Sequence, residues 1–219
     1  MCRLVLCACA MLISGCVYIS DHTATGACLD DLSSPIRNFC VVVPGVLWRG
    51  ERPTRADAKW LLEQRVGSVL SVQVDSLQSF EAVAPPRDFA HSVSYFQMRG
   101  FNPLQILTRS ELDEHIALYL AIVQEAPKPI YVHCRAGVDR TGVLTAAYRV
   151  LIEGTSAREA IAEMARFQSP WQRIDARYVR TVSEHRTEIL SQVEALRSRL
   201  RPDARITCSQ GKCESSTVP

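Results

Sequence analysis

The stretch Pro129–Gly142 reads P-I-Y-V-H-C-R-A-G-V-D-R-T-G, and the rest of the chain is interpreted outward from it. Its apolar start, Ile130 to Val132, predicts a short buried strand, and the apolar segment Gly142–Glu153 predicts a helix that Thr141 opens. A compact loop joins the two. Because the loop amides and the positive end of the helix dipole converge on one point, this stretch predicts a binding site for an anion.

Cys134 follows the predicted strand directly and lies in the field of that loop. The loop amides, the helix dipole and the Arg140 guanidinium all favour a thiolate, so we expect the pKa of Cys134 to lie well below its ordinary ~8.5. The planar fork of Arg140 can hold two oxygens of a phosphoryl group. Gly137, midway, permits a backbone conformation or a close approach that a Cβ would prevent. These residue types predict nucleophilic attack on phosphorus.

The string His133-Cys134-x-x-Gly137-x-x-Arg140-Thr141-Gly142 resembles the H-C-x-x-G-x-x-R-[ST]-G signature of the cysteine-dependent protein tyrosine and dual-specificity phosphatases. The resemblance extends over residues 45–168 and is nearest to the compact bacterial members of the dual-specificity type. It implies a single α/β domain with a small, mostly parallel sheet flanked by helices. It also implies hydrolysis through a phosphocysteine, with neither a metal nor another cofactor.

The resemblance, together with the chemistry of each side chain, gives a role to every residue of the loop. Cys134 is the nucleophile, Arg140 holds the phosphoryl group, and the Thr141 hydroxyl stabilises the sulfur as a leaving group. His133 and Gly142 support the loop. The residues expected to bind the substrate phosphate are Arg135, Ala136, Gly137, Val138, Asp139 and Arg140.

The segment in which the family usually carries a proton-donating aspartate contains no acid in this chain, because residues 99–105 read R-G-F-N-P-L-Q. Three alternatives stay open. Asp139 in the phosphate loop is the preferred general acid, as suggested for relatives with an A-G-x-D-R-T loop. Asp75, at the end of a strand predicted at Val66–Val74, is the second, although it also suits the cap of a short helix predicted at Leu77–Val83. The third is that the protein has no strong acid.

The missing acid bears on the substrate. Without a good proton donor an alkoxide leaves poorly, whereas a phenolate of parent pKa ~10 is a tolerable leaving group. We therefore expect a protein tyrosine phosphatase activity on phosphotyrosine or similar aryl esters. Phosphoinositide phosphatases of this superfamily often carry two basic loop residues, but here Arg135 is followed by Val138 at the second position. A phosphoinositide or inositol (pyro)phosphate is thus one alternative, and a non-catalytic phospho-ligand binding protein is another.

The N-terminus predicts export. The chain has 219 residues, 47% of them hydrophobic, and a net charge of +2 that gives no argument for a nucleic-acid partner. Residues 1–12 combine a basic start with an apolar core, and Ile13-Ser14-Gly15-Cys16 resembles a bacterial lipobox. We expect residues 1–15 to be a lipoprotein signal peptide and Cys16 to be lipidated. The protein would then be anchored in the periplasm, with the outer membrane favoured; a single membrane-spanning helix is the alternative.

The remaining boundaries follow from composition and periodicity. Residues 16–44 are predicted to be a tether, residues 45–201 the phosphatase domain and residues 202–219 a polar tail. Apolar residues recur at helical spacing from Ile174 to Leu200, which predicts a long C-terminal helix. That helix packs on the domain of a monomer or, alternatively, pairs as a dimeric coiled coil.

Four further cysteines are available for disulfides in an oxidising compartment, and they are Cys28, Cys40, Cys208 and Cys213. Three pairings are possible. The shortest loops join Cys28 with Cys40 and Cys208 with Cys213, while buried free thiols are the alternative.

Overall fold

The structure is a computed structural model that describes residues 33–72, 79–83, 85–89, 92–101, 108–168, 171–200, 204–209 and 212–217. The strands are β1 (Cys40–Val43), β2 (Leu47–Gly50), β3 (Ser68–Val72), β4 (Ser79–Val83), β5 (Ser94–Met98), β6 (Ile130–His133), β7 (Ala204–Ser209) and β8 (Lys212–Thr217). The helices are α1 (Arg55–Glu63), α2 (Arg109–Glu125), α3 (Asp139–Leu151), α4 (Ala157–Ala165), α5 (Gln172–Thr181) and α6 (Arg186–Arg197), with the 3-10 turns η1 (Arg87–Phe89) and η2 (Val182–His185).

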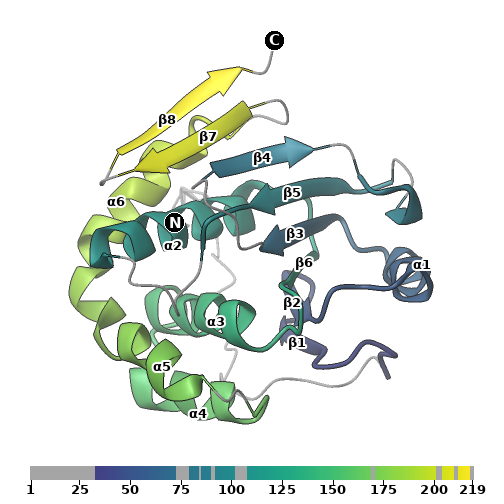
Figure 1. The fold of residues 1–219 in the computed structure, drawn as a ribbon, viewed down its shortest axis with the longest axis horizontal. Helices are drawn as coiled ribbons and strands as arrows, with labels where there is room; N and C mark the ends of the chain where they lie inside the picture. Colours follow the sequence, from purple (N-terminus) through teal and green to yellow (C-terminus); the bar gives the residue numbers. More distant parts are fainter. Residues whose placement is uncertain are drawn as a thin grey trace, which may run out of the picture.

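These strands form one sheet in the order β1-β2-β6-β3-β5-β4-β7-β8. The central strands β2, β6, β3 and β5 run parallel, and the pairs at both ends of the sheet are antiparallel. Figure 1 shows α2 to α6 on one side of the sheet and α1 on the other. The α/β fold predicted from the sequence is confirmed, and β6, which leads into the phosphate loop, lies between two parallel neighbours.

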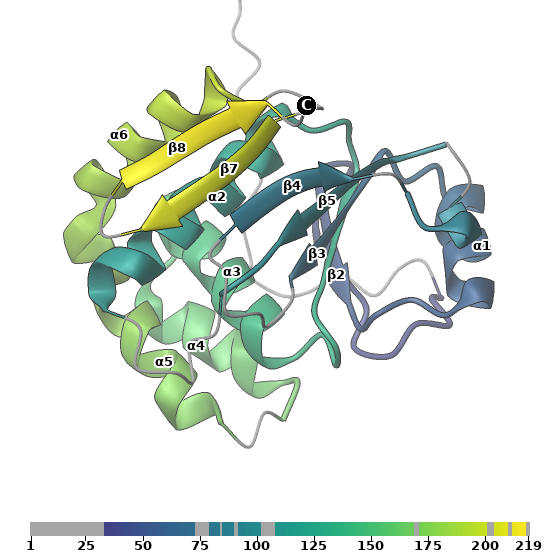
Figure 2. The same ribbon diagram turned by 45° about the horizontal axis from the view of Figure 1, so that its top comes forward.

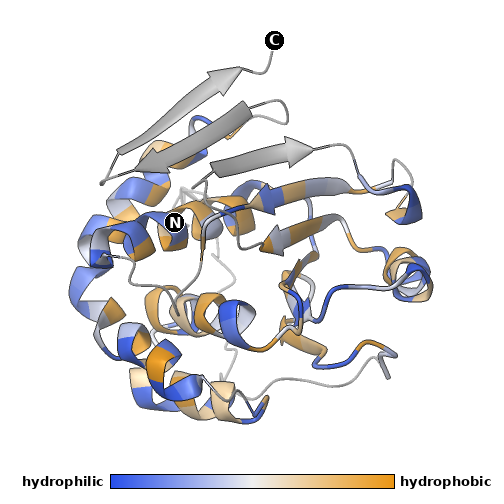
Figure 3. Ribbon diagram, viewed as in Figure 1, coloured by the Kyte–Doolittle hydropathy of each residue, from blue (hydrophilic) through white to orange (hydrophobic). Residues whose placement is uncertain are grey.

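Alternation along the central strands divides the core into two layers. Leu70 of β3 and Val132 of β6 face the helices α2, α3 and α6, whereas Val69 and Tyr131 face α1. Successive side chains of a strand point to opposite faces, so each strand serves both layers. The hydrophobic residues accordingly gather between the sheet and the helices, as Figure 3 shows.

Three helices begin with full capping boxes. Thr54 begins α1, Thr108 begins α2 and Ser156 begins α4, and each side chain accepts a hydrogen bond from the third backbone amide of its helix. In return, the acid at that third position accepts from the backbone amide of the cap. These local contacts favour a helix start at each of the three positions.

Two predicted elements are wrong in kind. The short helix predicted at Leu77–Val83 is replaced by strand β4, which pairs with β5 on one side and β7 on the other. The residues predicted as a polar tail contain the hairpin β7–β8, which extends the sheet and lies over α6 in Figure 2. Pairing with a distant strand supplied the backbone hydrogen bonds that local propensity did not predict.

The prediction of one long C-terminal helix is also wrong in part, because the 3-10 turn η2 separates α5 from α6. The elements α5, η2 and α6 together form a C-terminal arm. The break at η2 lets this arm follow the curved side of the domain (Figure 1). The predicted apolar seam packs inward, with Val182, Ile189, Val193 and Leu196 in the same core cluster as α2. Packing on the domain, the preferred prediction, is therefore what the structure has.

Polar contacts fasten the arm to α2. The buried Asp113 accepts a hydrogen bond from the Tyr178 hydroxyl at 2.7 Å, and its other oxygen lies 3.0 Å from Nδ1 of His185. Arg109 donates to Nε2 of His185 at 2.8 Å. His185 is thus a hydrogen-bonded packing residue.

The structure describes three of the four cysteines predicted to form disulfides, and they are Cys40, Cys208 and Cys213. Cys40 is disulfide-bonded. The backbone register places Cys208 directly opposite Cys213 in the β7–β8 hairpin. This position is compatible with a disulfide between them. Cys28 and Cys16 lie outside the described residues. Among the described helices, none is both long and apolar enough to cross a bilayer.

Replacing Arg149 should destabilise the domain strongly. Arg149 of α3 is 4% exposed and pairs with Glu163 at 3.0 Å and with Glu153 at 2.6 Å. Arg149→Met leaves the buried Glu163 without its cation, and we expect the free energy of unfolding to fall by about 3 kcal/mol or more. Urea unfolding measures this.

The matched control is Arg197→Met, because Arg197 also pairs with two glutamates, Glu125 and Glu194, but at the surface. Its cost should stay below about 1 kcal/mol. Equal losses in the two variants would contradict the assignment of Arg149 as a core ion pair.

Candidate active site

The phosphate loop lies where the sequence predicted it. β6 ends at His133, Cys134 follows, and α3 begins at Asp139. The helix thus starts two residues earlier than the predicted opening at Thr141. Val138 is the cap, and the amide of Gly142 makes a helical hydrogen bond to its carbonyl at 2.8 Å. This shift puts Asp139 and Arg140 in the first helical turn, at the positive end of the α3 dipole.

Four consecutive loop carbonyls are held from outside the loop. The carbonyl of Arg135 accepts from the Arg52 amide at 3.2 Å, and that of Ala136 accepts from Nδ2 of Asn38 at 2.9 Å. Nη2 of Arg49 donates to the carbonyl of Gly137 at 2.5 Å and to that of Val138 at 3.4 Å. Carbonyls turned outward leave the amides to face inward, as an anion-binding nest requires. The amides of Gly137 and Thr141 do hydrogen-bond the Cys134 sulfur.

Gly137 has both properties predicted for it. Its φ is +70°, a conformation that L side chains rarely adopt. An added Cβ would also collide with the backbone of Gly50 and lie 2.5 Å from the amide nitrogen of Glu51. The phosphate loop is therefore packed directly against the end of β2.

Cys134 has the electrostatics of a nucleophile. It is 3% exposed, and this burial raises its pKa. The hydroxyl and amide of Thr141, the charge of Arg140 and the amide of Gly137 outweigh burial, so the pKa of Cys134 is lowered from its ordinary value. Thr141 is itself fully buried, and its hydroxyl has no nitrogen or oxygen partner among the described residues. This leaves the hydroxyl available to the sulfur, as predicted.

Two arginines flank the loop in different ways. Arg140 is half-buried and donates to the carbonyl of Val72, at the end of β3, at 3.0 Å. Arg49 is 1% exposed and lies over the ring of Phe167, 3.8 Å from its centroid. Burial lowers the pKa of Arg49 to about 10, although the charges of Glu163 and Cys134 oppose this. Arg49 thus stays cationic at neutral pH, directly behind the loop.

His133 supports the loop as a neutral side chain. Burial lowers its pKa to about 4, and its Nδ1 donates to the carbonyl of Cys134 at 3.1 Å. The ring also stacks on Tyr131, with centroids 5.9 Å apart. A neutral imidazole does not compete with Arg140 for the substrate charge.

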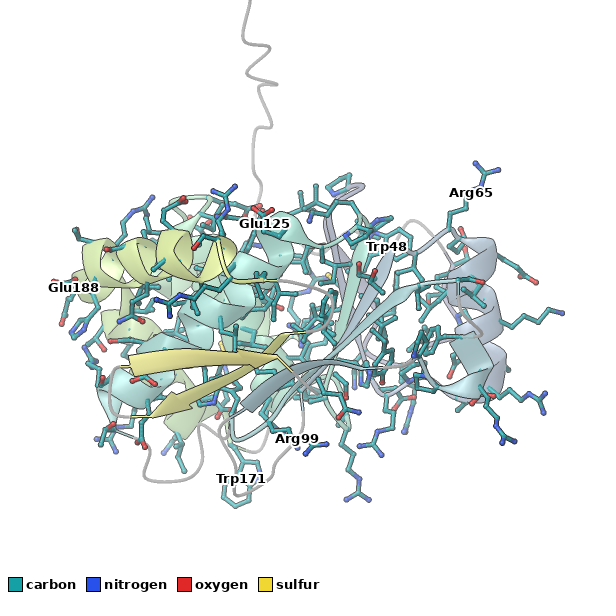
Figure 4. The ribbon with its side chains drawn as sticks, turned by 90° about the horizontal axis from the view of Figure 1, so that it is seen from above. Trp48, Arg65, Arg99, Glu125, Trp171 and Glu188 are labelled. Atoms are coloured by element: carbon teal, nitrogen blue, oxygen red, sulfur yellow. The ribbon has the colours of Figure 1, made fainter. Side chains whose placement is uncertain are left out.

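A second carboxyl group lies near enough to Asp139 to be affected by its charge. Asp175 of α5 is fully buried, and burial together with the charge of Asp139 raises its pKa to about 7. Trp171, one turn earlier at the start of α5, is exposed and lies in Figure 4 at the same edge of the molecule as Arg99, which follows β5. The N-terminal end of α5 therefore faces the carboxyl edge of the parallel strands, where such sheets bind ligands.

The other candidate acid is outside the described residues, as are residues 102–107 of the acid-free segment. Asp75 is therefore neither supported nor contradicted. The sequence reasoning missed three residues of the site. Arg49 and Asn38 act on loop carbonyls from distant segments, and Asp175 lies in a helix read only for its apolar seam.

The fold and this loop agree with comparisons to known proteins. A family profile described as "DSP-PTPase phosphatase fused to NAD+ Kinase" matches residues 43–181. The chain belongs to this phosphatase family. Its Cys134 loop and its central parallel strands lie inside the matched region, so the site described above is that of a cysteine-based phosphatase of the dual-specificity type.

Among curated relatives, the dual-specificity phosphatase Mpk3 of Drosophila melanogaster is 25% identical over 171 residues, or 77% of this chain. The match covers only 36% of the length of that relative. Two solved structures share the fold. P. aeruginosa TpbA has a TM-score of 0.53 at 21% identity, covering 76% of this chain and 98% of its own. The catalytic core of the S. cerevisiae PP-IP phosphatase Siw14 has a TM-score of 0.57 at 23% identity, covering 74% and 96%.

The Gly137→Ala substitution should disable the loop. We expect the affinity for vanadate, a phosphate mimic, to fall at least about tenfold, because the new Cβ displaces the loop from β2 and changes where its amides point. Isothermal titration of vanadate measures this. Gly45→Ala is the matched control, since Gly45 has φ +67° but open space around its Cβ position. Similar losses of affinity in both variants would refute the packing argument.

The thiolate of Cys134 should titrate at an unusually low pH, and Thr141→Val should raise that pH. The valine keeps the shape but removes the hydroxyl that lowers the pKa of Cys134. Absorbance at 240 nm against pH, with Cys134→Ser as the blank for the other cysteines, measures the midpoint. An unchanged midpoint in Thr141→Val would show that the hydroxyl does not act on the sulfur.

Proposed function

We propose that this phosphatase hydrolyses phosphomonoesters through a phosphocysteine, with phosphotyrosine or another aryl phosphate as the preferred substrate. One observation supports the mechanism above all. A thiol of lowered pKa lies within a loop whose carbonyls are held outward, next to an arginine in the first turn of a helix.

In the first step, the Cys134 thiolate attacks phosphorus in line as the phosphorus–ester oxygen bond breaks. Arg140 either releases the Val72 carbonyl or binds the phosphoryl group with its other guanidinium nitrogens. Together with the loop amides it stabilises the charge on the phosphoryl oxygens. In the second step, water attacks the phosphocysteine, and the hydroxyl of Thr141 stabilises the departing sulfur. The protein supplies position and charge, as phosphoryl transfer demands.

The preference for aryl esters rests on the leaving group. Residues 99–105 contain no carboxylate, so the candidate proton donors are Asp139 of the loop and Asp75, with the absence of any strong acid as the third alternative. A phenolate needs less help from such a donor than an alkoxide does. TpbA, of similar fold, has been solved with phosphotyrosine bound, at a TM-score of 0.50 and 21% identity.

An inositol pyrophosphate is the second candidate, because Siw14 is a PP-IP phosphatase of similar fold. The phosphate that leaves when an anhydride is cleaved also needs no strong acid. Arg135 is exposed and available to such a ligand, but Val138 occupies the second position where a basic residue would help. A non-catalytic binding protein would use the same loop without forming a covalent adduct. Trapping a phosphocysteine in a single turnover distinguishes it from an enzyme.

For the whole protein we propose a lipid anchor on Cys16 that holds the catalytic domain, as a monomer, at the periplasmic side of the bacterial envelope. The proposal rests on the lipobox-like sequence Ile13-Ser14-Gly15-Cys16 and on the disulfide of Cys40, which is typical of an oxidising compartment. Radiolabelled palmitate incorporated in a bacterial host, and lost in Cys16→Ser, tests it.

Substituting the nucleophile should abolish turnover. We expect hydrolysis of para-nitrophenyl phosphate to vanish in Cys134→Ser and to fall by at least about a hundredfold in Arg140→Ala, since both act in the transition state. Initial rates at saturating substrate measure this. EDTA should have no effect; inactivation by EDTA, with activity retained in Cys134→Ser, would contradict the mechanism.

A further inference from the structure

Arg49 of β2 is a buried cation with no ion-pair partner in the part of the chain that the structure describes. The residue is 1% exposed, and its Nε and Nη1 atoms have no hydrogen-bond partner there. Glu163, whose charge acts on Arg49, is paired with Arg149 instead. Burying a cation is costly, and no ion pair offsets that cost here. The role of Arg49 therefore lies in the hydrogen bonds that it does make.

Those hydrogen bonds go to the phosphate loop. Nη2 of Arg49 donates to the carbonyl oxygen of Gly137 at 2.5 Å and to that of Val138 at 3.4 Å. The guanidinium lies over the ring of Phe167, 3.8 Å from its centroid, and a Cβ built on Gly142 would lie 3.9 Å from Nη2. The guanidinium is thus held between an aromatic ring and the first turn of α3, so its orientation is fixed from two sides.

The two carbonyls determine where two amides point. In a planar trans peptide the C=O and N–H groups point in opposite directions, so holding the Gly137 carbonyl turns the Val138 amide the other way. Holding the Val138 carbonyl does the same for the Asp139 amide. Because both carbonyls point to Arg49 behind the loop, both amides point away from it, towards the inside of the loop.

Both amides belong to the start of a helix, because Val138 is the cap residue of α3 and Asp139 is its first residue. Amides at a helix start are not needed for the helix's own hydrogen bonds, and they bind anions such as phosphate. Val138 makes no side-chain cap hydrogen bond, whereas Thr54, Thr108 and Ser156 cap their helices. The start of α3 is thus built to receive an anion.

We propose that Arg49 is a positioning residue, which aims the Val138 and Asp139 amides at the phosphoryl oxygens of the substrate. The proposal rests on the proposed function of the loop. Arg49 does not touch the substrate, since its hydrogen bonds are with carbonyls on the outer side of the loop. Its effect on catalysis passes through two peptide units, whereas Arg140 acts on the phosphoryl group itself.

Arg49→Met tests this, because methionine fills similar space but has no donor for the loop carbonyls. We expect the affinity for vanadate to fall at least about tenfold and kcat/KM on para-nitrophenyl phosphate to fall at least about a hundredfold. Isothermal titration gives both the affinity and the number of sites. Misdirected amides weaken every site, whereas partial unfolding lowers the number of sites and leaves the affinity of each unchanged.

Arg49→Lys separates the charge of the side chain from its geometry. Lysine keeps the positive charge but has neither the planar fork nor the flat face that lies on Phe167. We expect the affinity for vanadate to stay at least about fivefold below that of the wild type. Full recovery in Arg49→Lys would show that charge alone matters and would overturn the positioning role.

Phe167 supplies a double-mutant cycle. Its ring lies under the guanidinium, so Phe167→Leu should loosen Arg49 and lower the affinity for vanadate about threefold. In the Arg49→Met background the same substitution should change the affinity no further, because the ring acts through Arg49. Equal losses in the two backgrounds would count against the proposal.

Arg186→Met is the matched control. Arg186 also donates to a backbone carbonyl, that of Val150 at 3.2 Å, but at the opposite end of α3 from the phosphate loop. Its loss should leave the affinity for vanadate and kcat/KM within about twofold of the wild type. If Arg49→Met does not fold, Arg49→Lys and Phe167→Leu carry the comparison.

Wild-type affinity for vanadate in Arg49→Met, or fewer sites of unchanged affinity, would overturn the role of Arg49. Neither result would affect the proposed function. That function fails separately if the wild-type protein forms no phosphocysteine and does not hydrolyse para-nitrophenyl phosphate.

Discussion

The site depends on the outward anchoring of one loop. In a peptide unit the N–H and the C=O point in opposite directions, so each carbonyl held outside the loop helps to aim an amide at its centre. Arg49 holds two of these carbonyls while remaining 1% exposed. Burying a cation is costly, and here the same charge also lies behind the Cys134 thiolate. Loop shape and nucleophile are thus stabilised by one side chain.

Burial has opposite consequences for the titratable groups around this loop. It raises the pKa of Cys134, but donors from Thr141, Arg140 and Gly137 reverse the effect and favour the thiolate. At Asp175 no donor compensates, so its carboxyl keeps a proton, and at His133 the imidazole stays neutral. A charged sulfur and neutral buried groups can therefore coexist near neutral pH within one small region.

The additions to the sheet lie away from the catalytic strands. β4, β7 and β8 continue the sheet beyond β5, and the arm of α5, η2 and α6 closes the helical side (Figure 1). The arm has a direct tie to the site, because the helix that carries Asp175 is the one fastened to α2 through Tyr178 and Asp113. The scaffold and the helix that carries Asp175 are therefore parts of one packed unit.

The sequence by itself determined the candidate nucleophile, the phosphate loop and the α/β class, because each depends on residues close together in the chain. It misjudged β4, the C-terminal hairpin and the break at η2, where distant strand pairing or packing overrode local propensity. Only the tertiary structure brought Asn38 to Ala136 and Arg49 to Gly137, across 98 and 88 residues. It likewise buried Asp175 within reach of the charge of Asp139. No local pattern encodes such contacts, since burial and proximity arise only when separate elements pack.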